Sequence, residues 1–254
     1  MLRSNEAGKS SLIATLLIAL AGCAQPAVKD IAANKTGYLD ENFSPQKLPA
    51  DVGKQVAAAE VKSPSRTLRI TLNATLEDSG KKETPVVLAT VKVLGNGLVQ
   101  EMQEYSNNGI PYAITYALSY MGLFPLKEQR VFYSRPTANL PTEVKQLNQL
   151  ARNLVRPNEN AEYVFEWLNG TSMQIANFSN IKLVCNSGKF YPAAQLHSNL
   201  SGNAIDLNCT RQINGVVRVK HKYVMLLEYG FVLKLDQQSS TNTEAFKVVG
   251  VDVL

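Results

Sequence analysis

The sequence has little of what most catalytic and metal sites are built from. Its 254 residues include three cysteines, two histidines and one tryptophan. It lacks the Gly-x-Ser-x-Gly elbow of α/β-hydrolases, a Ser-x-x-Lys followed by Lys-Thr-Gly, the His-Glu-x-x-His zinc motif and Asp-x-Asp calcium loops. Gly95-Asn96-Gly97 is not followed by the glycine of a dinucleotide fingerprint. The sequence therefore predicts no catalytic residue, no metal and no cofactor.

Long apolar runs and strong net charge are missing as well. The apolar run that begins at Leu12 covers about eleven residues, whereas a membrane-spanning helix needs ~20. Hydrophobic residues make up 45% and charged residues 19% of the chain, a balance typical of ordinary globular proteins. The net charge of +5 falls to about +4 without residues 1–22. Such mild charge does not predict a nucleic-acid partner.

The N-terminus carries the most informative motif. Arg3 and Lys9 precede the apolar run, which closes at Leu20-Ala21-Gly22-Cys23. This arrangement resembles a bacterial lipoprotein signal peptide, with an ordinary cleaved secretory signal as the alternative. The resemblance implies cleavage before Cys23, acylation of its thiol and α-amine, and a membrane partner through that lipid. Because Ala24-Gln25 follows in place of Asp, it also implies the bacterial outer membrane, with the domain in the periplasm by default and surface exposure left open.

Cys185 and Cys209 are the two cysteines that remain after Cys23. In an oxidising compartment this pair predicts one disulfide. Two free buried thiols are an alternative. A zinc site is disfavoured because His197 is the one histidine between them.

The composition divides the chain into four regions. Residues 1–22 are the signal peptide, and residues 23–65 hold the lipidated cysteine and a flexible tether, since prolines at 26, 45, 49 and 64 interrupt regular structure. Residues 66–160 form a β-rich region with one helix. Residues 161–254 form an antiparallel β-domain with the disulfide.

Alternation of apolar and polar residues predicts most of the strands. Residues 68–94 read as a hairpin, and turn signals separate six further apolar segments after residue 162. Residues 112–121 fit a strand better than a helix, because even positions are large and odd positions mostly small. Their tyrosines are interpreted as core with hydroxyls at the rim, or else as a stacking surface.

One helix is predicted over about 141–156. Pro141 suits a first turn, Arg156-Pro157 suits an end, and the apolar residues between them follow a helical spacing. Those residues are Val144, Leu147, Leu150, Ala151 and Leu154. The fold class is therefore mainly β, with antiparallel β-sandwich-like sheets and one clear helix, anchored to lipid through the tether.

The segment 216–223 combines an apolar face with a basic one. His221 shares the phase of Val217, Val219 and Tyr223 and is interpreted as a satisfied or rim histidine. Arg218, Lys220 and Lys222 alternate on the other face. Such a row is a solvated face, protection of an edge strand, or a candidate docking strip for an anionic partner.

These observations favour an exported, lipid-anchored envelope protein with a non-catalytic binding, docking or scaffolding role. Its partners would be the membrane and an envelope protein or anionic envelope polymer. The alternative is an anchored hydrolase of polysaccharide or peptidoglycan that uses a carboxylate pair. The candidate carboxylates are Glu101, Glu104, Glu162 and Glu166. The hydrolase predicts a deep cleft with two carboxyl groups, and the binding role predicts flat faces with a shallow or absent pocket.

Overall fold

The computed structural model describes residues 25–58 and 65–254. The predicted signal peptide and Cys23, on which the lipoprotein resemblance depends, lie outside the described residues. The helices are α1 (Val28–Ala33), α2 (Lys35–Asn42), α3 (Ala50–Ala57) and the short 3-10 turns η1 (Pro45–Lys47), η2 (Arg152–Val155) and η3 (Ala193–Gln195). The strands are β1 (Arg66–Asp78), β2 (Lys81–Glu83), β3 (Val86–Val93), β4 (Leu98–Asn107), β5 (Ile110–Tyr120), β6 (Phe124–Phe132), β7 (Thr142–Gln149), β8 (Glu162–Thr171), β9 (Ser179–Pro192), β10 (Asn203–Ile213), β11 (Val216–Leu226), β12 (Phe231–Ser239) and β13 (Asn242–Val253).

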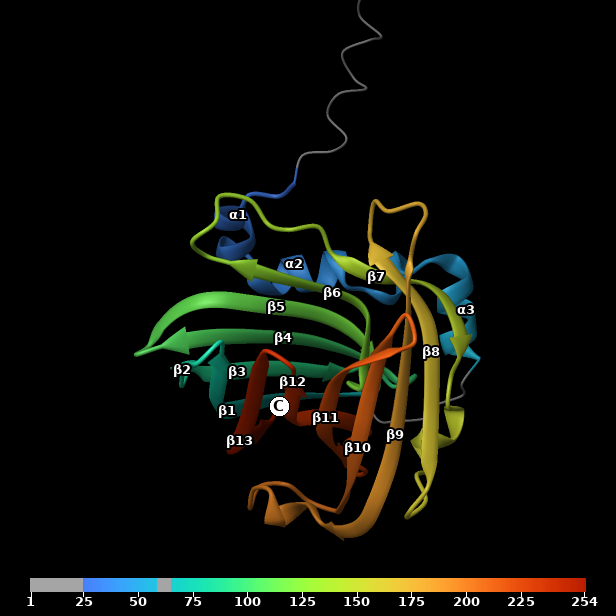
Figure 1. Ribbon diagram of the computed structural model, residues 1–254. Coiled ribbons are helices and arrows are strands. Elements are labelled where there is room, and N and C mark those ends of the chain that lie inside the picture. Colours follow the sequence, from blue (N-terminus) through green and yellow to red (C-terminus); the bar gives the residue numbers. More distant parts are fainter. Residues whose placement is uncertain (1–24, 59–64) are drawn as a thin grey trace, which may run out of the picture.

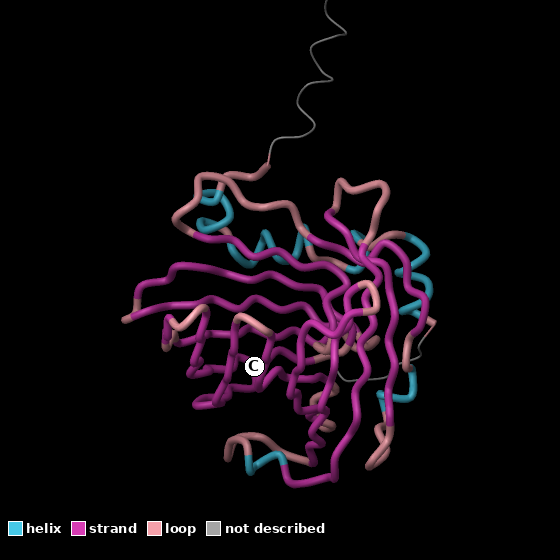
Figure 2. Tube along the Cα trace, viewed as in Figure 1, coloured by secondary structure: helices cyan, strands magenta, loops and turns pink. Residues whose placement is uncertain are grey.

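The strands form one antiparallel sheet that closes on itself (Figures 1 and 2). From β3 to β13 each strand pairs with the next one along the chain, and β1 pairs with both β3 and β13. Twelve strands thus make a barrel, with β2 added at the side of β1. The predicted sandwich is wrong in this respect, although the antiparallel β class is confirmed. Local alternation predicts strands, but it contains no information on whether the first strand reaches the last.

The predicted division near residue 160 does not split this sheet. β7 and β8 pair across it, and β1 pairs with β13 from Leu68–Val253 to Asp78–Asn242.

Two neighbouring pairs of strands in the barrel are joined over only a short length within the described residues. β6 and β7 share two registered Cα pairs, and β12 and β13 share three.

β12 pairs with β13 over only three residues, and it also forms a backbone hydrogen bond with the turn between β5 and β6. The Val232 amide donates to the Met121 carbonyl oxygen at 2.7 Å. Gly122 lies in this contact with φ +73°, and a Cβ there would be 2.4 Å from the Val232 oxygen. Glycine is therefore required both for the backbone angle and for the close approach of the two chains.

The helix predicted over 141–156 is wrong. Residues 142–149 form β7, and η2 is the only helical turn in that segment. β7 carries register shifts against β8 between Val144 and Gln146 and again between Leu147 and Gln149. A bulge inserts one residue, so Val144 and Leu147, three apart, are both buried in a strand. The bulges therefore imitate the apolar spacing of a helix.

The flexible tether is also wrong for residues 25–58. These residues form α1, α2, η1 and α3, and their apolar side chains are buried in the same core as β5 and β8. Phe43 is fully buried, and its ring stacks on Tyr116 with 5.7 Å between centroids. The buried helical residues are Val28, Ile31, Leu39, Val52 and Val56. These few apolar residues are enough to fix the segment in place, because they pack in one core with residues of the sheet.

The predicted disulfide is present. Cys185 in β9 and Cys209 in β10 are directly opposite each other in the antiparallel register, with Cα atoms 4.0 Å apart. Both strands continue beyond these residues, and β9 extends to Pro192. The bridge joins neighbouring strands of the sheet.

Candidate functional site

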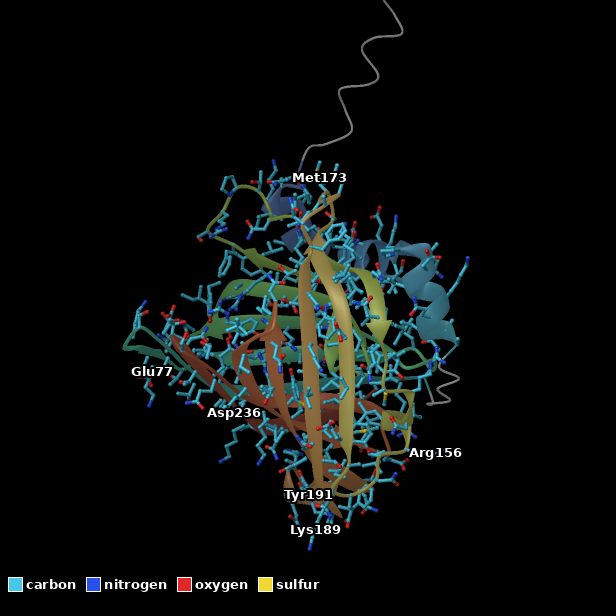
Figure 3. The ribbon with its side chains drawn as sticks, turned by 45° about the vertical axis from the view of Figure 1, so that its right-hand side comes forward. Glu77, Arg156, Met173, Lys189, Tyr191 and Asp236 are labelled. Atoms are coloured by element: carbon cyan, nitrogen blue, oxygen red, sulfur yellow. A yellow bond between two sulfur atoms is a disulfide. The ribbon has the colours of Figure 1, made fainter. Side chains whose placement is uncertain are left out.

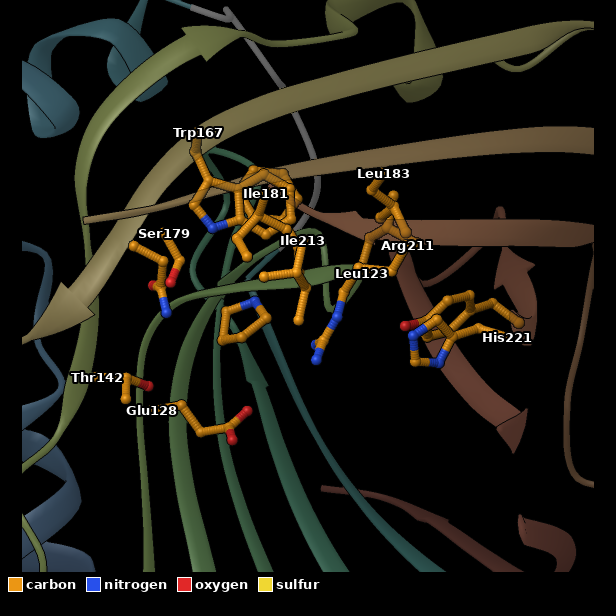
Figure 4. Close-up of a pocket in the computed structure, with 14 residues that line it drawn as sticks. Leu123, Glu128, Thr142, Trp167, Ser179, Ile181, Leu183, Arg211, Ile213 and His221 are labelled. Carbon is orange, nitrogen blue, oxygen red and sulfur yellow. The ribbon is translucent and has the colours of Figure 1, made fainter. Parts of the chain in front are cut away.

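A cavity lined by polar and charged side chains lies inside the barrel. One lobe, of about 310 Å³, is drawn in Figure 4, and a second has about 330 Å³. The lobes share a wall made by Leu123, Pro125, Glu128, Arg211, His221 and Tyr223. A third lobe of about 320 Å³ shares Arg130 and Glu244 with the second. Together the three lobes form a chain of adjoining spaces.

The two faces of β5 explain why this space exists. The small side chains of Thr115, Ala117 and Ser119 line the second lobe. On the opposite face, Tyr116 and Tyr120 are fully buried in the core that includes α2. The heavy and light faces predicted from the sequence are therefore confirmed for residues 114–120, and Tyr116 and Tyr120 are core. Tyr112 is the exception, because it is half-buried on the cavity side and lines the third lobe. The light face leaves room for long charged side chains from strands across the barrel.

Those charged side chains come from five strands. Glu101 lies on β4, Glu128 and Arg130 on β6, Arg211 on β10, Lys234 on β12 and Glu244 on β13. The Lys234 ammonium is 2.7 Å from a Glu244 carboxylate oxygen. The Arg130 guanidinium lies over the Tyr105 ring, 4.6 Å from its centroid. The first two lobes are thus lined by three carboxyl groups and three cations.

Arg130 and Arg211 have no carboxylate of their own. Neither side chain forms an ion pair or hydrogen bond with any residue of the described ranges. Their Nε atoms, together with His221 Nδ1, are buried without a hydrogen-bond partner among the described residues. Buried polar groups are normally satisfied, so these three atoms mark places for water or a ligand.

Burial controls the protonation of the cavity. Burial first and the nearby Glu128 carboxylate second raise the pKa of Glu101 to about 7, against the lowering effect of Lys234. Burial also raises the pKa of Glu128, against the opposing effect of Lys234 and the two arginines. His221 has a pKa lowered to about 3, first by burial and then by Lys234 and Arg211. At neutral pH His221 is therefore neutral, and Glu101 is partly protonated.

The basic row on β11 lies on the face opposite His221 and Tyr223. Arg218, Lys220 and Lys222 are exposed, and Lys222 pairs with Asp206 at 3.1 Å. Because β11 lies between β10 and β12, the interpretation as protection of an edge strand is wrong. The row as a docking strip stays a prediction.

The four candidate carboxylates are not brought together. Glu101 lines the cavity, whereas Glu104 accepts hydrogen bonds from Lys35 and from the Tyr133 hydroxyl elsewhere. Glu166 accepts from Asn180, and Glu162 is exposed. Sequence reasoning placed His221 on the face of Tyr223 but interpreted it as a satisfied or rim histidine, whereas it lines the cavity and its Nδ1 is buried without a partner among the described residues. It missed the cavity residues Glu128, Arg130, Arg211, Lys234 and Glu244. The sequence pattern that could have indicated them is a charged residue at a strand position whose side chain points to the same face as buried apolar residues.

No group of three metal-ligating side chains occurs within 25–58 and 65–254. In the same part of the chain, no helix is long and apolar enough to cross a membrane.

Comparison with known proteins gives distant likenesses of fold. No family model and no curated protein matches the chain. A β-barrel-like protein of domain of unknown function DUF1849 from Brucella abortus has 8% identity and a TM-score of 0.44, covering 76% of this chain and 99% of its own. A DUF1329 family protein from Desulfovibrio piger has 8% identity and a TM-score of 0.39, with 80% and 92% covered. A putative outer membrane lipoprotein-sorting protein domain from Vibrio parahaemolyticus has 6% identity and a TM-score of 0.37, with 83% and 93% covered. At these scores the likenesses carry no functional argument.

Proposed function

We propose that this chain is an exported, lipid-anchored envelope protein that binds a small anionic ligand inside its barrel and leaves it chemically unchanged. The motif ending at Cys23 supports the anchor, and the Cys185–Cys209 disulfide is compatible with an oxidising compartment. The observation that carries the binding role is the pair of lumen arginines without carboxylate partners. This reading replaces the flat, pocketless surface that the binding role predicted from the sequence.

The chemistry of the arginines favours an anion. Guanidinium groups stay charged in proteins and match carboxylate or phosphate oxygens with two parallel hydrogen bonds. The carboxyl groups that could neutralise them, Glu101 and Glu128, are those whose ionisation burial opposes. A ligand carboxylate or phosphate would supply the missing negative charge. Each lobe, at about 310–330 Å³, falls in the lower range of small-ligand sites.

Trp167 offers a built-in reporter for this binding. It is the only tryptophan of the chain, is 4% exposed and lines the first lobe near Arg211 (Figure 4). We expect inorganic phosphate or glutarate to change its fluorescence saturably. Arg211→Gln should weaken that response at least about tenfold, because one charge-assisted contact contributes roughly 1.5–3 kcal/mol. Arg218→Gln is the matched control, since Arg218 is exposed on the opposite face of β11.

Two outcomes of the titration would overturn the binding role. One is the absence of a saturable response to either anion in the wild-type protein. The other is an equal response in the Arg211→Gln and Arg218→Gln variants.

Hydrolysis remains a second candidate because one observation favours it. Glu101 and Glu128 face one cavity with raised pKa values, as in a general acid beside a second carboxylate. The candidates differ in their response to Glu101→Gln. A binding site should hold the anion at least as tightly, because a competing carboxylate is gone. A hydrolase should lose its release of reducing sugars from purified peptidoglycan.

A further inference from the structure

The chain is attached to the barrel only three residues after Cys23. The Ala138 amide donates to the Pro26 carbonyl oxygen at 3.1 Å, and Ala27 forms an antiparallel bridge with Thr137. The Val28 amide then donates to the Pro136 oxygen, also at 3.1 Å. Three extended residues span at most about 11 Å. An acylated Cys23 would therefore hold this end of the barrel against the bilayer, with no long tether between them.

The β8–β9 loop lies at the same end of the molecule. The Ser172 amide donates to the Pro141 oxygen at 2.8 Å, which joins the loop to the segment that holds Pro26 and Ala27. Figures 1 and 3 show this loop, with Met173 at its tip, projecting from the end where the N-terminal residues lie. We call residues 25–27, 134–139 and 172–178 the anchor-proximal end.

The loop exposes two large apolar side chains. Met173 is 58% exposed and Ile175 is 93% exposed. Gln174 between them turns the other way. It accepts a hydrogen bond from the Thr171 amide at 3.2 Å and donates to the carbonyl oxygens of Ala176 and Asn177 at 2.8 Å. The loop is thus organised from within by Gln174, while its apolar side chains point away from the protein.

The charge of this end suits a phospholipid surface. Among its three segments Arg135 is the one charged residue, and none of them contains Asp or Glu. Carboxylates would be repelled by lipid phosphates, whereas a cation and two apolar side chains are the usual components of an interfacial contact.

We infer that Met173 and Ile175 insert into the bilayer to which Cys23 is anchored, so that the protein is held in one orientation by its lipid and by this loop. The inference rests on the proposed lipid anchor. Asn169 and Ser179, which pair at the base of the loop, also line the first lobe of the cavity. The bound orientation therefore turns that lobe toward the membrane.

The test places a tryptophan at the tip of the loop. Full-length acylated protein with Ile175→Trp is reconstituted into phosphatidylcholine vesicles with or without brominated acyl chains. Ile110→Trp is the matched control, because Ile110 is 71% exposed at the β4–β5 turn, away from the anchor-proximal end (Figure 1). After subtraction of Trp167 fluorescence from the wild-type protein, we expect at least about twofold quenching at position 175 and little at position 110.

The outcomes separate the loop from the anchor. If the protein floats with the vesicles and intact mass shows acyl chains on Cys23, equal quenching at the two positions overturns the loop inference alone. If the mature chain carries no acyl group, both the anchor and the inference are overturned. Both substitutions lie on exposed side chains, and unchanged unfolding midpoints verify that the variants are folded.

Discussion

Glu101 and His221 face the same cavity, yet burial shifts their pKa values in opposite directions. In each case the neutral form is favoured, because a buried charge loses its hydration. Glu101 therefore takes up a proton on folding between pH 4.5 and about 7. His221 loses one on folding between about pH 3 and 6.5. Rising pH thus lowers stability through Glu101 and raises it through His221, so the two effects oppose each other where their ranges overlap, between about pH 4.5 and 6.5.

Glu101→Gln should isolate the first effect. The amide is neutral at every pH, so the free energy of unfolding of the variant should rise relative to wild type between pH 4.5 and pH 8. The expected change is on the order of 3 kcal/mol, from a pKa raised from 4.5 to about 7. Urea unfolding at both pH values measures it, with Glu162→Gln on exposed Glu162 as the control. A difference that does not vary with pH would contradict this account.

The alternation of side chains between the two faces of a strand was the sequence feature that predicted most about individual residues. The alternation of large and small residues on β5 was readable because side chains of a strand alternate between faces. The same rule placed His221 beside Tyr223. It did not reveal that Arg130 and Arg211 meet in one lumen, because that depends on how strands far apart in the chain face each other across the barrel.

At the scale of elements, α2 and the turn that follows it show how much packing changes a weak local pattern. α2 contains a glycine, carries no basic residue in its last turn and has one buried residue, Leu39. An isolated helix of eight residues is not stable in water. Its conformation depends instead on contacts such as the Tyr38 hydroxyl donating to Gln129 at 2.7 Å and Phe43 stacking on Tyr116.

Phe43→Ala should therefore be strongly destabilising. The side chain is fully buried between the helical segment and β5, and large-to-small changes of this kind cost about 3–5 kcal/mol. Thr36→Ala, on an exposed side chain of α2, is the control and should have little effect. Urea unfolding provides both values. If residues 25–58 were a tether, the two variants would unfold at the same urea concentration.

β7 shows the opposite error, in which a strand looked like a helix. Two bulges within eight residues break the alternation that identifies a strand. Bulges respond to the pairing partner, here β8, and the partner is unknown when one segment is considered alone. The segment was therefore predicted as a helix because its bulges, which depend on β8, place buried residues at a helical spacing.

At the scale of the whole molecule, the attachment of Pro26 and Ala27 to the barrel would place an acylated Cys23 close to the folded domain. Cys23→Ser should move the folded protein from the membrane fraction to the soluble fraction. Three acyl chains exceed what stable anchoring requires, whereas two exposed apolar side chains do not reach it. Ala24→Ser should leave the protein in the membrane fraction. Retention of the Cys23→Ser variant on membranes would contradict the lipid anchor.

By itself the sequence determined the strands with clean alternation, the two faces of β5, the pairing of Cys185 with Cys209 and the motif that predicts lipidation. All of these depend on neighbouring residues or on a count of cysteines. Only the tertiary structure decided that β1 meets β13, that residues 25–58 pack as helices and that five strands direct their charges into one cavity. Ring closure depends on twist and register summed over twelve strands, and no local stretch of sequence contains that sum.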